Sequence, residues 1–85
     1  MESNQKKLWY VYMIECQDSS LYTGITTDVK RRFEEHQNGT GGNYTRSHPP
    51  VKVVYIEEVK DRCEASIREA EIKKMNAEEK RQLID

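Results

Sequence analysis

The sequence predicts a small α+β domain, with a three-stranded, mainly antiparallel sheet flanked by helices. Three runs rich in β-branched and aromatic residues are typical of strands, and they occupy residues 8–14, 21–25 and 51–59. One helical segment separates the second run from the third, and the remaining helical segments follow the third run. Strands and long helices therefore do not alternate strictly, which favours the α+β class over a parallel-sheet class.

Length and composition limit the chain to one domain without a uniformly basic surface. The 85 residues fit a single domain, which we place at 7–85 after a disordered tail at 1–6. The 14 Lys and Arg residues against 15 Asp and Glu residues give a net charge of −1. This balance excludes a uniformly basic surface that would bind nucleic acid on all sides. Transmembrane and signal-peptide patterns are absent, and Cys16 and Cys63 form no disulfide framework. We therefore expect a cytoplasmic protein with no membrane association.

The first strand and the hairpin that follows it bring two tyrosines together. Residues 8–14 are apolar on both alternating faces, so this strand should be central and covered on both sides. A three-residue loop at 17–19 would place Ile14 opposite Tyr22 and leave Tyr12 diagonal to Tyr22, about 7–8 Å away. Two phenols at that spacing can flank one phosphate. Aromatic pairs across a hairpin are also simply good packing, and that alternative stays open.

The helix at 28–37 carries two polar groups beside its apolar stripe. Thr27 or Asp28 can cap the helix, and Val29 and Phe33 form the stripe one turn apart. The polar groups one turn apart along its edge are Arg32 and His36. A guanidinium suits a phosphate oxygen, and an imidazole there could relay a proton or donate to phosphate. The alternative for both is an ordinary solvated helix face.

Residues 38–50 predict a long irregular loop, which in a compact domain is usually functional or disordered. The loop lies within the segment 29–52, which holds five Lys and Arg against two Asp and Glu, whereas 57–85 holds seven against nine. A basic loop with an aromatic residue is typical of a nucleic-acid contact. It is equally typical of a glycine-rich connector. The loop residues singled out here are Tyr44, Thr45, Arg46 and His48.

The second helical segment places a carboxylate beside its predicted inward face. Asp61 begins this helix, and Glu69 lies beside an inward stripe that we assign to Cys63, Ile67 and Ala70. A carboxylate is the expected hard ligand for Mg²⁺, which keeps most of its waters. The alternative is a routine ion pair with a neighbouring lysine or arginine.

A last short helix begins at Asn76. Glu79 lies three residues further on, which predicts a capping box. This helix should bury Leu83 or Ile84.

Taken in this order, these residues resemble the GIY-YIG nuclease superfamily, and most closely its small one-domain bacterial members, over residues 8–84. The family's first motif matches Tyr10-Val11-Tyr12, with Tyr10 and Val11 in place of glycine and isoleucine. Its second motif matches Tyr22-Thr23-Gly24. The family's arginine, histidine and glutamate match Arg32, His36 and Glu69. The late asparagine of many larger members has Arg81 at the corresponding distance.

The resemblance implies an endonuclease that hydrolyses DNA phosphodiester bonds with one divalent ion, Mg²⁺ or Mn²⁺. Cutting of branched or damaged DNA in repair or recombination is the finer expectation. In this picture Glu69 holds the metal, Arg32 neutralises charge on the phosphate, Tyr22 is the general base, and Tyr12 and His36 complete the catalytic set. The expected nucleic-acid contacts are Gly24, which would leave room for the cut strand, together with Lys30, Tyr44, Thr45, Arg46 and His48.

The alternative is a weakly active or inactive GIY-YIG module that binds nucleic acid or a protein partner. In the nuclease reading, too, a protein partner could supply the substrate specificity. A monomer is the default expectation for the oligomeric state.

Overall fold

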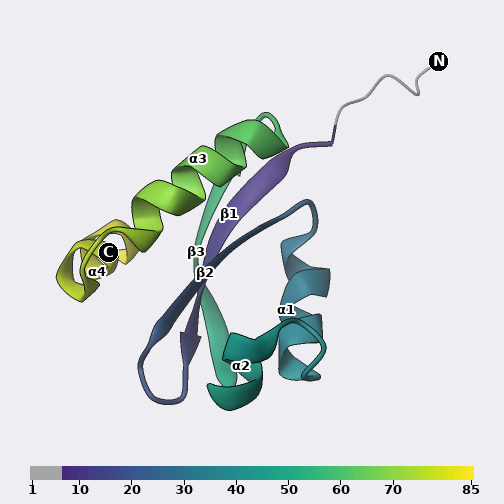
Figure 1. Ribbon diagram of the computed structural model, residues 1–85, viewed down its shortest axis with the longest axis vertical. Helices are drawn as coiled ribbons and strands as arrows, with labels where there is room; N and C mark the ends of the chain where they lie inside the picture. Colours follow the sequence, from purple (N-terminus) through teal and green to yellow (C-terminus); the bar gives the residue numbers. More distant parts are fainter. Residues whose placement is uncertain (1–6) are drawn as a thin grey trace.

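A computed structural model of the chain describes residues 7–85 (Figure 1). The predicted disordered tail, residues 1–6, lies outside the described residues. The predicted α+β class, with three strands, is confirmed. The elements in order are β1 (Trp9–Cys16), β2 (Leu21–Thr26), α1 (Val29–Gln37), α2 (Asn43–Ser47), β3 (Pro50–Val59), α3 (Arg62–Lys73) and α4 (Ala77–Ile84).

The sheet is antiparallel throughout, with strand order β2-β1-β3, so β1 is central as predicted. In the β1–β2 hairpin, Ile14 pairs with Tyr22 and Tyr12 pairs with Gly24. This is the register that a three-residue loop predicts, because the loop length fixes which residues face each other. Tyr12 and Tyr22 therefore lie on the same face of the sheet.

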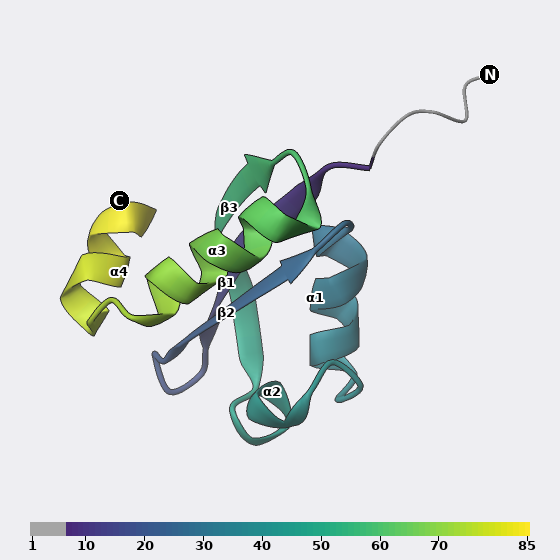
Figure 2. The same cartoon turned by 45° about the horizontal axis from the view of Figure 1, so that its top comes forward.

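Helices cover both faces of the sheet (Figures 1 and 2). On one face, Val11 and Met13 of β1 pack against Ala65 and Ile72 of α3, with α4 at the edge of this core. On the other face, α1 packs against the alternate residues of β1. That second core consists of Tyr12, Ile14 and Cys16, with Tyr22, Val29, Phe33 and Val53 packed around it.

The helix α3 is rotated relative to its predicted orientation. The predicted inward stripe is wrong, because Cys63 and Ala70 are exposed and Ile67 is 57% exposed. The buried residues are instead Ala65 and Ile72, which are two helical turns apart. Glu69, one turn after Ala65, is consequently turned toward the sheet.

The segment at 38–50 is more ordered than predicted. It contains the short helix α2, which packs against α1. Because a five-residue helix has no full apolar stripe of its own, the sequence pattern carries no signal for it.

The C-terminal helix α4 is confirmed, including its capping box between Asn76 and Glu79. It is joined to the hairpin by Arg81, which donates to Glu15 Oε2 at 3.0 Å and to the Ser19 carbonyl at 2.8 Å. The residue at the position of the family's late asparagine therefore holds α4 against the β1–β2 turn. No helix within residues 7–85 is long and apolar enough to cross a membrane.

Candidate active site

Tyr12 lies at the centre of the candidate site, and Gly24 makes room for it. The Tyr12 side chain is 1% exposed, and it passes over Gly24, its partner on β2. A Cβ atom added to Gly24 would lie 2.6 Å from Tyr12 Oη and 2.8 Å from Cζ. The space at Gly24 is thus filled by a phenol ring, so it is not available to an approaching nucleic-acid strand as the sequence suggested.

A buried chain of hydrogen bonds runs from Tyr12 through His36 to Thr45. Tyr12 Oη lies 3.0 Å from His36 Nε2, and His36 Nδ1 lies 2.7 Å from Thr45 Oγ1. Burial raises the pKa of Tyr12 to about 12, and burial, followed by the positive charge of Arg32, lowers the pKa of His36. Both groups are therefore neutral at pH 7.

Tyr22 belongs to a cluster of aromatic rings beside these hydrogen-bonded residues. Its ring centroid lies 6.3 Å from that of Tyr12 and 5.0 Å from that of His36. On its outer side Tyr22 stacks with Tyr44 at 5.6 Å, and Tyr44 stacks with His48 at 4.1 Å. The predicted proximity of the two hairpin tyrosines is confirmed. Since His48 already packs against Tyr44, less of that ring is left for a nucleobase.

Arg32 is held in place beside the tyrosines by two contacts that the sequence analysis did not identify. One terminal nitrogen donates to Glu35 Oε1 at 2.9 Å, and the other donates to the Gly41 carbonyl at 2.7 Å. Hydrogen bonding to Glu35 raises the pKa of Arg32, to which Tyr12 also contributes. The guanidinium is partly exposed, so it retains donors that can face a ligand.

Glu69 comes from the opposite layer, on the side of α3 that faces the sheet. Its side chain is 23% exposed, and Oε2 forms an ion pair with Lys73 at 3.1 Å. After burial and the nearby Tyr22, the charge of Glu69 is one of the factors that raise the pKa of Tyr12. Glu69 is therefore within electrostatic reach of the phenol, although within residues 7–85 it makes no hydrogen bond to Tyr12, Tyr22, Arg32 or His36.

The acidic residues of the described chain fit only a metal with few protein ligands. No group of three or more His, Cys, Asp or Glu side chains gathers within residues 7–85. A single half-buried carboxylate suits Mg²⁺ or Mn²⁺, because such ions keep several waters and need only one or two carboxylates. Glu69 meets this requirement.

The predicted nucleic-acid contacts are divided between the surface and the interior. Lys30, Tyr44 and Arg46 are exposed, and His48 is partly exposed. Thr45 differs from them, because its side chain is only 3% exposed and is bonded to His36. Its hydroxyl faces the interior, so the structure does not present it to a nucleic acid.

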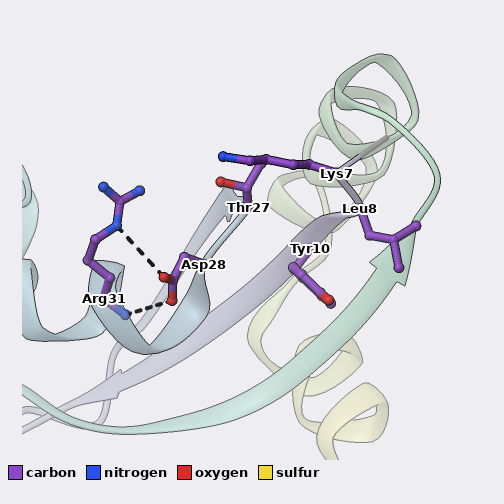
Figure 3. A pocket seen from close by; sticks show the side chains of 6 residues that line it. All are labelled: Lys7, Leu8, Tyr10, Thr27, Asp28 and Arg31. Atoms are coloured by element: carbon purple, nitrogen blue, oxygen red, sulfur yellow. Dashed lines mark hydrogen bonds and ion pairs between the residues drawn. The ribbon is translucent and has the colours of Figure 1, made fainter. Parts of the chain in front are cut away.

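An open pocket at the N-terminal end of α1 lies apart from these groups (Figure 3). Asp28 caps α1 there by accepting from the Arg31 backbone N–H at 3.0 Å. None of the predicted site residues lines this pocket. Its lining residues are Lys7, Leu8, Tyr10, Thr27, Asp28 and Arg31.

Comparison with known proteins gives close relatives over most of the chain. The UPF0213 protein DP2720 of Desulfotalea psychrophila is 49% identical over 77 residues, which cover 89% of this chain and 70% of the relative. The UPF0213 protein HQ_3675A of Haloquadratum walsbyi is 51% identical over 76 residues, covering 89% and 85%. Such relatives therefore occur in bacteria and in archaea.

Two solution NMR structures share the fold. The UPF0213 protein BH0048 from Bacillus halodurans matches with a TM-score of 0.58 and 42% identity, over 91% of this chain and 82% of that one. The protein EF2693 from E. faecalis matches with a TM-score of 0.62 and 41% identity, over 92% and 83%. The family model described as the GIY-YIG catalytic domain matches residues 8–82. The chain therefore belongs to the GIY-YIG family.

Proposed function

We propose that this protein is a divalent-metal-dependent endonuclease that hydrolyses phosphodiester bonds in DNA. Family membership supports a nucleic-acid substrate. The observation that carries the proposal is the meeting of Tyr12, Tyr22, Arg32 and His36 on one face of the sheet, within electrostatic reach of Glu69. These groups come from different elements, and the ring centroids of Tyr12, Tyr22 and His36 lie within 6.3 Å of one another.

Two residues would handle the charge of the reaction. Arg32 donates hydrogen bonds to the scissile phosphate and compensates the negative charge that builds up on it. Glu69, whose carboxylate is paired with Lys73, would hold the divalent ion. A divalent ion there supplies Lewis-acid stabilisation of the phosphate and of the leaving oxygen.

The proton from the attacking water goes to the pair of Tyr12 and His36. The hydroxyl of Tyr12 is bonded to His36 Nε2, and Tyr12 is shielded from bulk water, so Tyr12 Oη would take a proton only from a water that the bound substrate brings against it, while passing its own proton to that nitrogen. This concerted transfer avoids a free phenolate, which the raised pKa of Tyr12 makes costly. Tyr22, the general base implied by family resemblance, then contacts the phosphate instead.

The pH dependence tests this pair. Burial lowers the pKa of His36, so its NMR titration midpoint is expected below the ordinary value of about 6.5. A protonated Nε2 cannot accept the Tyr12 proton, so kcat should fall as the pH drops through that same midpoint. An acid limb of kcat that does not follow the His36 midpoint would assign the base elsewhere, with Tyr22 as the first alternative.

The decisive test of the function compares two glutamates on α3. Purified full-length protein is incubated with branched, flapped, nicked and single-stranded DNA, and with RNA, in Mg²⁺ or Mn²⁺. The wild type should cleave DNA, and Glu69→Gln should lower kcat by about a hundredfold or more. Glu71→Gln is the matched control, because Glu71 is exposed on the same helix and, within residues 7–85, its side chain bonds only to Arg68, so kcat should stay within about twofold of the wild type.

Circular dichroism and thermal unfolding establish that each variant is folded. A wild type that cuts no substrate in the panel, or a Glu69→Gln variant as active as the wild type, would end the proposal.

A second function, a nucleic-acid-binding module with little activity, is favoured by one observation. Both terminal nitrogens of Arg32 already bond within the protein, and Glu69 is already paired with Lys73. Binding that weakens with salt, unchanged in Glu69→Gln and without cleavage, would select this function.

A further inference from the structure

We propose that Thr45 is a positioning residue that holds His36 in one tautomer, with the ring proton on Nδ1, so that Nε2 accepts the proton of Tyr12. Thr45 was expected to touch nucleic acid, and this inference gives it a different task. The assignment of the tautomer stands on the geometry of the folded chain. Only its kinetic consequence rests on the proposed nuclease activity.

The three groups form a closed polar chain inside the protein. Thr45, His36 and Tyr12 are 3%, 1% and 1% exposed, and the two hydrogen bonds between them measure 2.7 Å and 3.0 Å. Because bulk water does not reach these side chains, each proton must be shared among the groups themselves and their immediate neighbours. The neutral imidazole of His36 therefore carries its proton either on Nδ1 or on Nε2, and each choice sets the direction of both hydrogen bonds.

In the first arrangement Tyr12 donates to His36 Nε2, and Nδ1–H donates to Thr45 Oγ1. In the second arrangement Thr45 donates to Nδ1, and Nε2–H donates to Tyr12 Oη. Arg32 lies beside the Tyr12 hydroxyl, and a guanidinium can only donate. Any contact of Arg32 with the phenol would use the acceptor side of Oη and leave the phenol proton for Nε2.

Intrinsic acidity favours the same arrangement. A phenol is the most acidic of the three neutral donors, and an imidazole nitrogen is the most basic of the acceptors. The pairing of Tyr12 O–H with Nε2 is consequently the strongest bond that the chain can form. It leaves Nδ1 carrying the ring proton, and Thr45 Oγ1 supplies the acceptor that this buried N–H requires.

The position of Thr45 on α2 explains how a short helix reaches the site. The α2 segment follows the connection in which the Gly41 carbonyl accepts from Arg32 at 2.7 Å. A Cβ atom added to Gly41 would lie 2.6 Å from His36 Nδ1, so the chain passes close to the imidazole here. The neighbour Tyr44 stacks on Tyr22. The α2 segment thus contacts Tyr22 directly and His36, the partner of Tyr12.

The first measurement is the tautomer itself, which needs neither metal nor nucleic acid. Long-range ¹H–¹⁵N NMR of the wild-type protein should show a protonated Nδ1 and an unprotonated Nε2 for His36. Thr45→Val removes the hydroxyl that accepts from Nδ1–H while keeping the side chain at nearly the same size. The ¹⁵N shifts of Nδ1 and Nε2 should then move toward each other as the tautomer protonated on Nε2 becomes populated. Thr45→Ser should restore the wild-type shifts. Thr40→Val, at an exposed threonine of the same connection, is the matched control.

The kinetic measurement separates positioning from nucleic-acid contact. Thr45→Val should lower kcat by about tenfold with KM unchanged, and Thr45→Ser should recover most of the loss. A rise in KM or a weaker salt dependence of binding, with kcat unchanged, would instead make Thr45 a nucleic-acid contact and overturn the proposal.

Two NMR outcomes would also overturn it: a wild-type His36 protonated on Nε2, or shifts that do not respond to Thr45→Val in a folded protein. If Thr45→Val does not fold, the wild-type tautomer and the Thr45→Ser shifts decide the question. The expected tautomer in a protein that cleaves nothing would leave this inference standing and would remove the proposed function alone.

Discussion

Replacing Arg32 by alanine is expected to lower kcat by about 10²- to 10³-fold, the usual cost of removing a group that stabilises charge in the transition state. The guanidinium is oriented for this role by Glu35 and by the Gly41 carbonyl, at 2.9 Å and 2.7 Å. A lysine at this position would keep the charge. It could not, however, bond to Glu35 and to the Gly41 carbonyl and also donate to the phosphate with the fixed geometry of a guanidinium. Arg32→Lys should therefore recover only a small part of the loss.

Arg31 offers the matched control for Arg32. It is the preceding residue on α1, its side chain is 63% exposed, and its contact with Asp28 is a weak one at 4.0 Å. Arg31→Ala should keep kcat within about threefold of the wild-type value. At most it should weaken the binding of DNA, in the same way that added salt does. Equal losses of kcat in the two alanine variants would contradict the assignment of Arg32 to the phosphate.

Replacing Gly24 by alanine is expected to displace the ring of Tyr12 and to break its hydrogen bond to His36. The added Cβ would meet Oη at 2.6 Å and Cζ at 2.8 Å, and the ring has no free space because Tyr12 is buried. Overpacking of this kind costs about 1–3 kcal/mol of unfolding free energy. Urea unfolding should show that loss, and kcat should fall because Tyr12 no longer reaches Nε2 of His36.

The control for Gly24 is a glycine that has room around it. Gly39 has a φ of +81°, and no atom of the described residues lies within 4 Å of an added Cβ. Asparagine tolerates that backbone conformation well. The free energy of unfolding of Gly39→Asn should therefore stay within about 0.5 kcal/mol of the wild-type value. A Gly24→Ala variant with wild-type stability and an unchanged His36 NMR signal would show that the position of Tyr12 does not require glycine at residue 24.

The sequence by itself determined the features that depend on neighbours in the chain. Residues 8–14, which are apolar on both faces of the strand, predicted a central strand, and the three-residue loop predicted the register that brings Tyr12 beside Tyr22. The helix starts at Asp61 and Asn76 also followed from local chemistry, because a capping side chain bonds backbone groups only a few residues away. For α1 the sequence left Thr27 and Asp28 open, and the structure has Asp28 as the cap.

Only the tertiary structure decided which helix faces and which side chains meet. The face of α3 that is buried carries Ala65 and Ile72 rather than Ile67, since a helix with several apolar positions rotates to suit the surface it packs against. That rotation turns Glu69 toward the sheet, and long-range packing likewise brings Thr45 to His36. Contacts of this kind depend on the relative placement of whole elements, and residue spacing along the chain does not encode that placement.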